Sequence, residues 1–341
     1  MGVSALERIY STPEFDTFSP PAERRPHVVP FELTTGCNWN KCTFCNGYKG
    51  VVYKEKTLDE YKTHVDEVFG NLQGYRNLKR IFIGGGNALN VPTDKLFNAI
   101  DYTSRKFRKH TGYTARRISL YANTLSILRK SVGELTHLKC ADGGLQLIYW
   151  GVESGATEVL RYGNKGCTKE DILEASEHVN PSAIDKSIMV MPGLGGKKYY
   201  DVHVRETAEV LGAIKPAFVT FMGVNASSDT PYYQRMKEEE RNGANRPLTD
   251  QELGQQIIDI IAALPQMRSG ESIKIGCFPP DIDQVGHNPL AFGSLDLFQA
   301  NKAQIIKRLE LQNKTGKQPE TTVRNTYNIF TPVYSFWGIR I

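Results

Sequence analysis

Three of the chain's six cysteines lie within nine residues, in the run CNWNKCTFC that spans residues 37–45. Thiolates are soft ligands, which select zinc, copper(I) or an iron–sulfur cluster. A structural zinc site takes four protein ligands, usually as two short pairs, and the other cysteines and the histidines supply no second pair. Cys37, Cys42 and Cys45 therefore favour a [4Fe–4S] cluster that leaves one iron for a non-protein ligand. The alternative is a zinc site completed by a remote Cys or His.

The elements that must position this loop alternate regularly along the chain. Apolar runs predict strands at residues 28–33, 80–83, 118–121, 144–150, 186–191 and 217–222. Helical periodicity falls between them, at residues 57–72, 93–107, 125–138, 168–179 and 199–211. The first helix has Thr57 as its N-cap and Glu60 at the capping-box position. Strict alternation indicates an α/β fold with a parallel sheet and helices outside it, but it does not separate an open doubly wound sheet from a partial barrel.

The cysteine loop resembles the cluster motif of the radical S-adenosylmethionine (SAM) superfamily. The common form of that motif is CxxxCxxC, whereas this chain has the variant CxxxxCxxC, because four residues separate Cys37 from Cys42. An extra residue in an irregular loop costs little. The resemblance implies a (β/α)6 partial TIM barrel with a C-terminal extension. It also implies that the three cysteines bind a [4Fe–4S] cluster whose fourth iron is chelated by SAM, and that Phe44 lies beside the adenine.

The glycine-rich ends of three predicted strands carry the resemblance further. The run Gly84-Gly85-Gly86 resembles the segment whose backbone meets the amino group of SAM, and its alternative is a simple turn. The run 151–155 resembles the branch that includes oxygen-independent coproporphyrinogen oxidases, Elp3-like proteins and methylthiotransferases. By this resemblance Glu153 binds SAM at its ribose hydroxyls, although an acidic residue at a strand end also serves as a helix cap. Gly193, in the turn 192–196, would lie close to the adenine.

Two positions depart from that branch. Its coproporphyrinogen-oxidase-like members carry Glu-Ala-Asn near the end of the third strand, whereas this chain has Tyr121-Ala122-Asn123. Asn123 therefore keeps its place as a predicted SAM contact without the preceding glutamate. The arginine that holds the SAM carboxylate has two candidates here, Arg161 and Lys165, and either could instead be a solvated helix residue.

We predict three regions in the chain. Residues 1–26 form a proline-spotted N-terminal lead, residues 27–225 the radical SAM core, and residues 226–341 a helical and irregular extension that closes the barrel. Within the extension we expect a helix at 249–264 and a seventh strand at 272–277. The weakly periodic segment beyond residue 278, with Asp281, His287 and residues 333–341, fits a lid or side wall.

The resemblance implies a radical SAM enzyme that cleaves SAM reductively to a 5′-deoxyadenosyl radical, which abstracts hydrogen from a small-molecule substrate. Reduced flavodoxin or ferredoxin would supply the electron. Tyr121, Tyr149 and His287 are candidates for the substrate side. Cys140, Cys167 and Cys277 are expected to be buried small hydrophobic residues, with Cys167 also a candidate thiyl hydrogen donor. One alternative is a methyl- or methylthiotransferase that acts on tRNA or protein; a second, of another class, is a non-catalytic iron–sulfur or zinc carrier.

Composition and charge limit the partners and the compartment that the sequence predicts. The 42 basic and 37 acidic residues are interspersed, so the net charge of +5 gives only a mild preference for anionic partners, and no basic stripe with aromatic residues favours nucleic acid. No apolar run approaches the length of a membrane span, and no signal peptide is seen, so the cytoplasm is the expected compartment.

Overall fold

The computed structural model describes residues 19–23, 27–277, 290 and 292–316. Their main feature is a curved sheet in the order β1-β4-β5-β6-β7-β8-β9-β10. The first seven strands run parallel, and β10 pairs antiparallel with β9. The bounds are β1 Val28–Glu32, β4 Arg80–Gly84, β5 Arg117–Ala122, β6 Leu147–Glu153, β7 Asp185–Val190, β8 Phe218–Phe221, β9 Ile273–Cys277 and β10 Phe292–Leu297.

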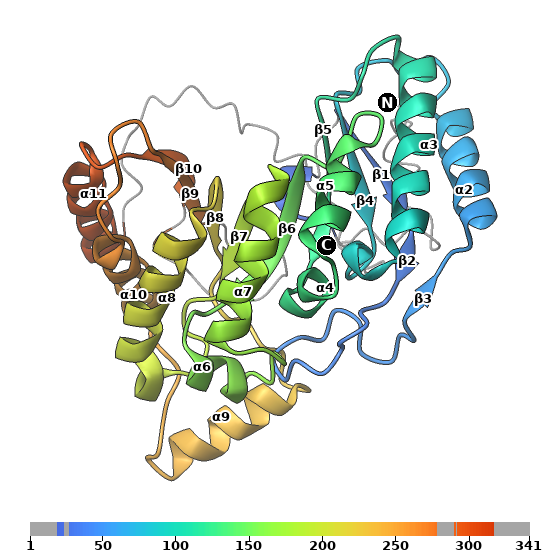
Figure 1. Cartoon of the computed structure of the whole chain (residues 1–341). Coiled ribbons are helices and arrows are strands. Elements are labelled where there is room, and N and C mark those ends of the chain that lie inside the picture. The colour runs from blue at the N-terminus through green and yellow to red at the C-terminus, as the bar shows by residue number, and fades with distance from the viewer. Residues whose placement is uncertain (1–18, 24–26, 278–289, 291, 317–341) are drawn as a thin grey trace, which may run out of the picture.

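The predicted partial barrel is confirmed. Within the described residues β1 and β10 are the two edges of the sheet and do not pair, so the barrel is open (Figure 1). The predicted seventh strand is β9, and it joins the same sheet as the core, whereas β10 was not predicted. The boundary at residue 225 stays a prediction. The readings of Asp281, His287 and residues 333–341 lie outside the described residues.

Helices cover the outer face of the sheet (Figure 1). Their bounds are α2 Leu58–Asn71, α3 Thr93–Thr111, α4 Thr124–Leu128, α5 Val132–Cys140, α6 Thr157–Tyr162, α7 Lys169–Val179, α8 Tyr200–Ile214, α9 Pro231–Arg241, α10 Asp250–Ala263 and α11 Lys302–Thr315. Beneath them the outward side chains Trp150, Ile188 and Val219 are paired in register on β6, β7 and β8 and are fully buried. No helix in the described ranges is long and apolar enough to cross a membrane.

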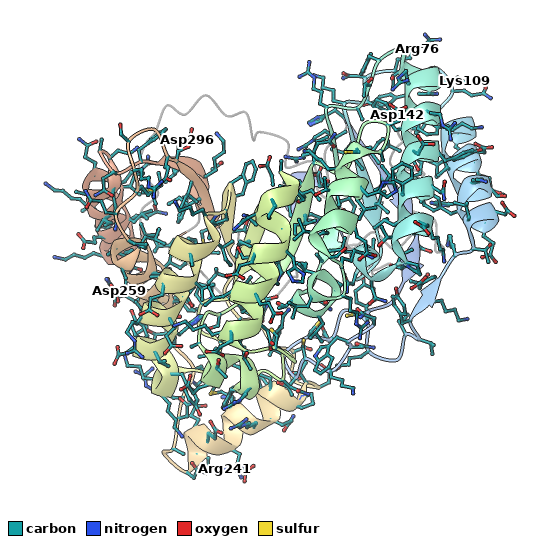
Figure 2. The ribbon with its side chains drawn as sticks, in the orientation of Figure 1. Arg76, Lys109, Asp142, Arg241, Asp259 and Asp296 are labelled. Atoms are coloured by element: carbon teal, nitrogen blue, oxygen red, sulfur yellow. The ribbon has the colours of Figure 1, made fainter. Side chains whose placement is uncertain are left out.

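Short polar signals set the helix boundaries. The Thr57–Glu60 capping box begins α2 as predicted. The helix predicted at 125–138 is wrong as a single element, because α4 ends at Leu128 and the Ser131 side chain accepts the N–H of Glu134 to begin α5. Charged side chains such as Arg241, at the end of α9, and Asp296, on β10, project from the periphery (Figure 2).

The amino end of the barrel is closed by a buried charge cluster. Of the predicted N-terminal lead the structure describes residues 19–23, and the short helix η1 (Pro21–Glu23) carries Glu23 into the barrel. The fully buried Glu23 carboxylate lies 2.6 Å from Nη2 of Arg117 and 3.6 Å from Nε of Arg80, the residues that begin β5 and β4. The hydroxyl of Tyr149 donates to it at 2.7 Å. Tyr149, a candidate for the substrate side, is thus tied to the end of the barrel opposite the cysteines.

Candidate functional site

The cysteine loop leaves the carboxyl end of β1 with all three thiols half-buried. In the described part of the chain, no three His, Cys, Asp or Glu side chains surround a position for one metal ion. Each thiolate of a [4Fe–4S] cluster binds a different iron, so its sulfur atoms stand farther apart than the ligands of a single ion. Burial raises the pKa of the Cys42 thiol to about 11 and also raises the pKa of Cys45. Metal coordination removes such a thiol proton outright, so the raised pKa values do not prevent the three cysteines from holding a cluster.

The four residues between Cys37 and Cys42, here the spacer, are individually anchored. Asn38 donates to Asn90 Oδ1 at 3.0 Å and accepts from Asn87 Nδ2 at 2.8 Å, which ties the loop to the segment after β4. Asn40 has the left-handed φ of 44° that asparagine tolerates better than most residues, and its Nδ2 donates to the Tyr48 carbonyl at 2.7 Å. The extra residue of the variant motif is therefore built into a defined turn.

A second segment, residues 163–166, lies along the spacer and is called here the clamp segment. Trp39 Nε1 donates to the Asn164 carbonyl, and Asn164 Nδ2 donates to the Lys41 carbonyl, both at 2.9 Å. A Cβ added at Gly166 would lie 2.3 Å from the Trp39 ring, so only glycine lets the indole pack there. These contacts join the cysteine loop to the connection between α6 and α7. These contacts were not predicted, because residues 163–166 carry no local pattern other than residues that favour turns.

Phe44 is buried in an apolar cluster and packs against Gly163 of the clamp segment. Its neighbours include Leu194, from the turn 192–196, and Tyr162 and Val159 of α6. The turn is held in place because the Gly193 N–H donates to Gln256 Oε1 at 2.7 Å. The two segments predicted to meet the adenine thus lie together, and the adenine contact itself stays a prediction.

The glycines after β4 pack against the root of the cysteine loop. Gly85 has a φ of +105°, and a Cβ there would lie 2.2 Å from the Thr34 carbonyl oxygen. The Gly86 N–H donates to the Gly36 carbonyl at 3.1 Å. Close backbone approach does require glycine here, but in this structure the approaching segment is residues 34–36. The predicted contact of Gly84, Gly85 and Gly86 with the SAM amino group stays a prediction.

Glu153 and Lys165 form a buried ion pair beside the cysteines. Glu153 ends β6 after a bulge, with a left-handed φ of 65°, and its Oε1 lies 2.9 Å from Nζ of Lys165. Their side chains are 6% and 12% exposed. Burial by itself lowers the pKa of the Lys165 ammonium, but the charges of Glu153 and Cys42 more than offset it, and the net pKa is raised. Lys165 is therefore a cation at neutral pH.

The second carboxylate oxygen of Glu153 receives no hydrogen bond from the described residues. Among the described residues Oε2 of Glu153 is buried and accepts no hydrogen bond. A buried acceptor without a donor costs about 1–3 kcal/mol, which is a reason to expect a ligand donor at that place. Vicinal hydroxyls of a ribose are donors of the right kind. The residues present thus fit a nucleoside-containing cofactor.

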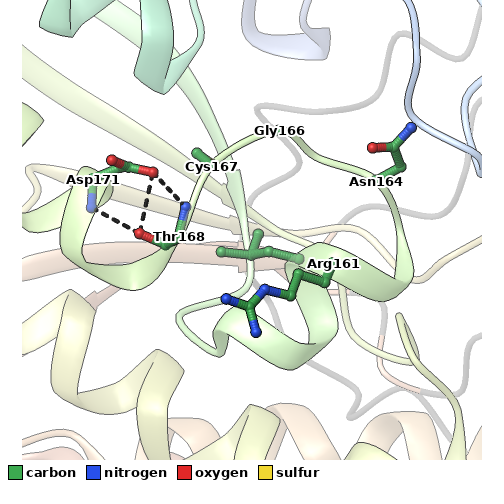
Figure 3. A pocket seen from close by; sticks show the side chains of 7 residues that line it. Arg161, Asn164, Gly166, Cys167, Thr168 and Asp171 are labelled. Atoms are coloured by element: carbon green, nitrogen blue, oxygen red, sulfur yellow. Dashed lines mark hydrogen bonds between the residues drawn. The ribbon is translucent and has the colours of Figure 1, made fainter.

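The other predicted SAM contacts divide into one near the cysteine loop and one farther out. Asn123 caps α4 by accepting the N–H of Ser126 at 2.8 Å, and its Nδ2 lies 3.5 Å from Asn38 Oδ1. Arg161 is exposed and lines a pocket of about 260 Å³ between α6 and α7 (Figure 3). Of the two candidates for the SAM carboxylate, the structure brings Lys165 to Glu153 and leaves Arg161 in this outer pocket.

The three cysteines outside the loop differ in burial. Cys167 and Cys277 are buried, as expected, whereas Cys140 is exposed at the end of α5 and the expectation for it is wrong. Cys167 lies in the outer pocket with Arg161. Its role as a thiyl hydrogen donor stays a prediction.

Comparison with known protein families identifies the superfamily to which the chain belongs. Residues 31–211, more than half of the chain, match the radical SAM superfamily, and the chain belongs to that superfamily. It is a radical SAM enzyme, which uses a [4Fe–4S] cluster and SAM. The predicted superfamily, enzyme class and cofactors are confirmed. No curated protein sequence matches the chain.

Solved structures resemble the chain at low identity. The radical SAM methyltransferase TsrM from Kitasatospora setae is 16% identical with a TM-score of 0.48, and the match covers 63% of this chain and 40% of that one. The archaeal Methanocaldococcus infernus Elp3 is 14% identical with a TM-score of 0.48, covering 85% and 63%. Methylornithine synthase PylB is 13% identical with a TM-score of 0.47, covering 83% and 81%. The chain thus spans well under half the length of TsrM, and the substrates of these proteins are not transferred to it.

Proposed function

We propose that Cys37, Cys42 and Cys45 bind the [4Fe–4S] cluster and that the enzyme uses SAM to abstract hydrogen from a small-molecule substrate. When bound, the cluster supplies one electron to the SAM sulfonium, which breaks the S–C5′ bond and yields methionine and a 5′-deoxyadenosyl radical. Reduced flavodoxin or ferredoxin, the general donors of this superfamily, is the proposed source of the electron.

The observation that carries the proposal is the unpartnered Oε2 of Glu153. In this assignment Oε2 accepts a ribose hydroxyl while Oε1 keeps Lys165 in place. The Lys165 ammonium has three donors, so it can bind the SAM carboxylate without releasing Glu153. Phe44 and the turn at Gly193 bound the adenine side, and Asn123 borders the cysteine loop. These groups orient the cofactor and exclude water, which matters because a primary carbon radical abstracts hydrogen from whatever is nearest.

The test is SAM cleavage by the full chain. After anaerobic reconstitution with iron and sulfide and reduction with dithionite, we expect 5′-deoxyadenosine by chromatography, and none from the Cys42→Ala variant. Cleavage can await substrate, so the assay is repeated with candidate metabolites. A fully iron-loaded protein that never forms 5′-deoxyadenosine would contradict the proposal and favour the carrier alternative. Consumption of two SAM molecules with transfer of labelled methyl would instead establish a methyltransferase.

A further inference from the structure

Strand register aligns two rows of side chains across the inner face of the barrel. The lower row consists of Tyr121, Tyr149, Ser187 and Phe218, which are paired in register from β5 to β8. The upper row, two residues farther toward the carboxyl ends, consists of Gly151, Met189 and Thr220. Side chains alternate between the faces of a strand, so both rows point away from the helix-covered face that holds Trp150, Ile188 and Val219.

Besides the half-buried Gly151, four residues of these rows reach solvent from inside the barrel. Tyr121, Met189, Phe218 and Thr220 are half-buried, although β5, β7 and β8 are each paired with a strand on both sides. Their outward neighbours on the same strands are buried under helices. The accessible surface of the four is therefore on the inner face.

The upper row adjoins the proposed cofactor site. Gly151 lies two residues before Glu153, and a Cβ added to it would be 2.6 Å from Glu153 Oε1. In the proposed function Glu153 binds the ribose hydroxyls, and the same ribose carries the C5′ radical. A molecule that covers Met189 and Thr220 would therefore lie beside the reacting carbon.

The side chains of the two rows favour one kind of substrate. The Tyr121 ring meets Phe82 edge-on with centroids 5.4 Å apart and meets Tyr149 at 6.1 Å, which makes a preformed aromatic floor. Aromatic rings and the flexible thioether of Met189 favour contact with another flat ring. The described charges next to the two rows are paired: Glu23 with Arg80 and Arg117, Glu153 with Lys165, and Lys274, next to Phe218 in register, with Asp296 at 2.7 Å. Asp185, which is exposed and in register with Leu147, lies at the amino end of β7, away from Met189 and Thr220. Beside Met189 and Thr220 the described residues offer no unpaired counter-ion, so a charged ring would have to give up its hydration there without compensation.

We propose that the inner face from Tyr121 to Phe218, beneath the paired side chains of Met189 and Thr220, is the substrate site and that it binds an uncharged aromatic ring. This inference rests on the proposed function, because Glu153 places the cofactor beside the site. The ring, or a carbon attached to it, is the group that faces C5′.

The experiment measures binding of indole to the reconstituted full chain with SAM, by calorimetry under anaerobic conditions. Indole should bind the wild type, and Thr220→Phe, which fills the site, should weaken binding by about ten-fold or more, equivalent to about 1.4 kcal/mol. Met189→Phe fills the same space from β7 and serves as a second variant if Thr220→Phe folds poorly. The matched control is Thr136→Phe, the same substitution on the exposed face of α5.

The outcomes separate this inference from the proposed function. Absence of indole binding to the wild type, or equal binding by wild type and both filling variants, would overturn the inference. In that case formation of 5′-deoxyadenosine by the wild type would leave the proposed function standing. Equal binding of benzylammonium and indole would also overturn the claim that the ring is uncharged.

Discussion

The two ends of the barrel each hold a buried carboxylate, and the two are paired differently. At the amino end Glu23 faces two arginines, and hydroxyl groups of Ser119 and Tyr149 also donate to it. At the carboxyl end Glu153 faces Lys165, and its second oxygen has no donor in the described chain. Oε2 of Glu23 also accepts no hydrogen bond, but Nε of Arg80 lies 3.6 Å away and compensates its charge.

The difference is our reason for proposing that Glu153, and not Glu23, binds a ligand. A closed charge cluster such as that of Glu23 stabilises only the arrangement that forms it, and removing one member leaves buried charges unpaired. A buried carboxylate with one oxygen unused costs free energy until a ligand donates to it. Both carboxylates are buried, whereas Glu23 has four described partners and Glu153 has one.

The largest expected effect is the loss of stability in Glu23→Ala. Arg117 and Arg80 would each lose the ion pair that they make with Glu23, and breaking a buried pair costs about 3–5 kcal/mol. Urea unfolding should report this loss, while the SAM dissociation constant should change less than about two-fold. Glu271→Ala removes an exposed pair with Lys215 and should leave stability within error. A Glu23 variant that keeps wild-type stability would show that the cluster contributes nothing.

A second effect concerns pH, because a buried histidine supports the carboxyl end of the barrel. His203 bridges Ser154 and the Met191 carbonyl, and burial lowers its pKa to about 4. Unfolded histidine binds a proton near pH 6.5, so stability should be full above that pH and should fall by about 3 kcal/mol as the pH drops toward 4.

Urea unfolding between pH 7.5 and 4.5 measures this dependence. His64, whose pKa burial also lowers to about 4, contributes a similar slope. His203→Gln should therefore remove about half of the decline and no more. An unchanged slope in that variant would show that His203 is not neutral in the folded protein.

The smallest of the three effects tests the carboxylate oxygen of Glu153 that is proposed to bind SAM. Glu153→Gln keeps the size of the side chain but removes its charge, and a hydrogen bond to a charged group is worth about 1.5–3 kcal/mol. We expect the SAM dissociation constant of the reconstituted enzyme to rise by about ten-fold or more. Glu23→Gln is the matched substitution at the other end and should leave SAM affinity unchanged. Equal effects of the two variants would remove the distinction between the carboxylates.

Much of the fold was predictable because its signals are local. Each core strand is a short apolar run, and capping residues such as Thr57 and Thr168 mark helix starts within one residue. The Ser131-Glu134 pair carried the same signal, but the leucine periodicity on either side of it favoured one continuous helix. The strand β10 was missed since its alternation is weak and its pairing with β9 depends on a distant segment.

The site was predictable only as far as its motifs extend. Cys37, Cys42 and Cys45 were predicted from their types and spacing, and Glu153 from the resemblance of residues 151–155 to one branch of the superfamily. Nothing local shows that Lys165 and not Arg161 reaches Glu153, because that depends on where α6 ends. The environment of Glu153 Oε2 and the contacts of Glu23 form only when strands far apart in sequence assemble, so no local pattern predicts them.

The clamp segment has a consequence for how such chains diverge. Trp39 and Lys41 of the spacer are held by Asn164, and Trp39 packs on Gly166, so the spacer and the clamp segment form one unit. Deleting one spacer residue to restore the shorter motif would leave the clamp segment without its partners. In natural homologues the longer cysteine motif should therefore be inherited together with an Asn and a Gly at the positions of Asn164 and Gly166, and lost together with them.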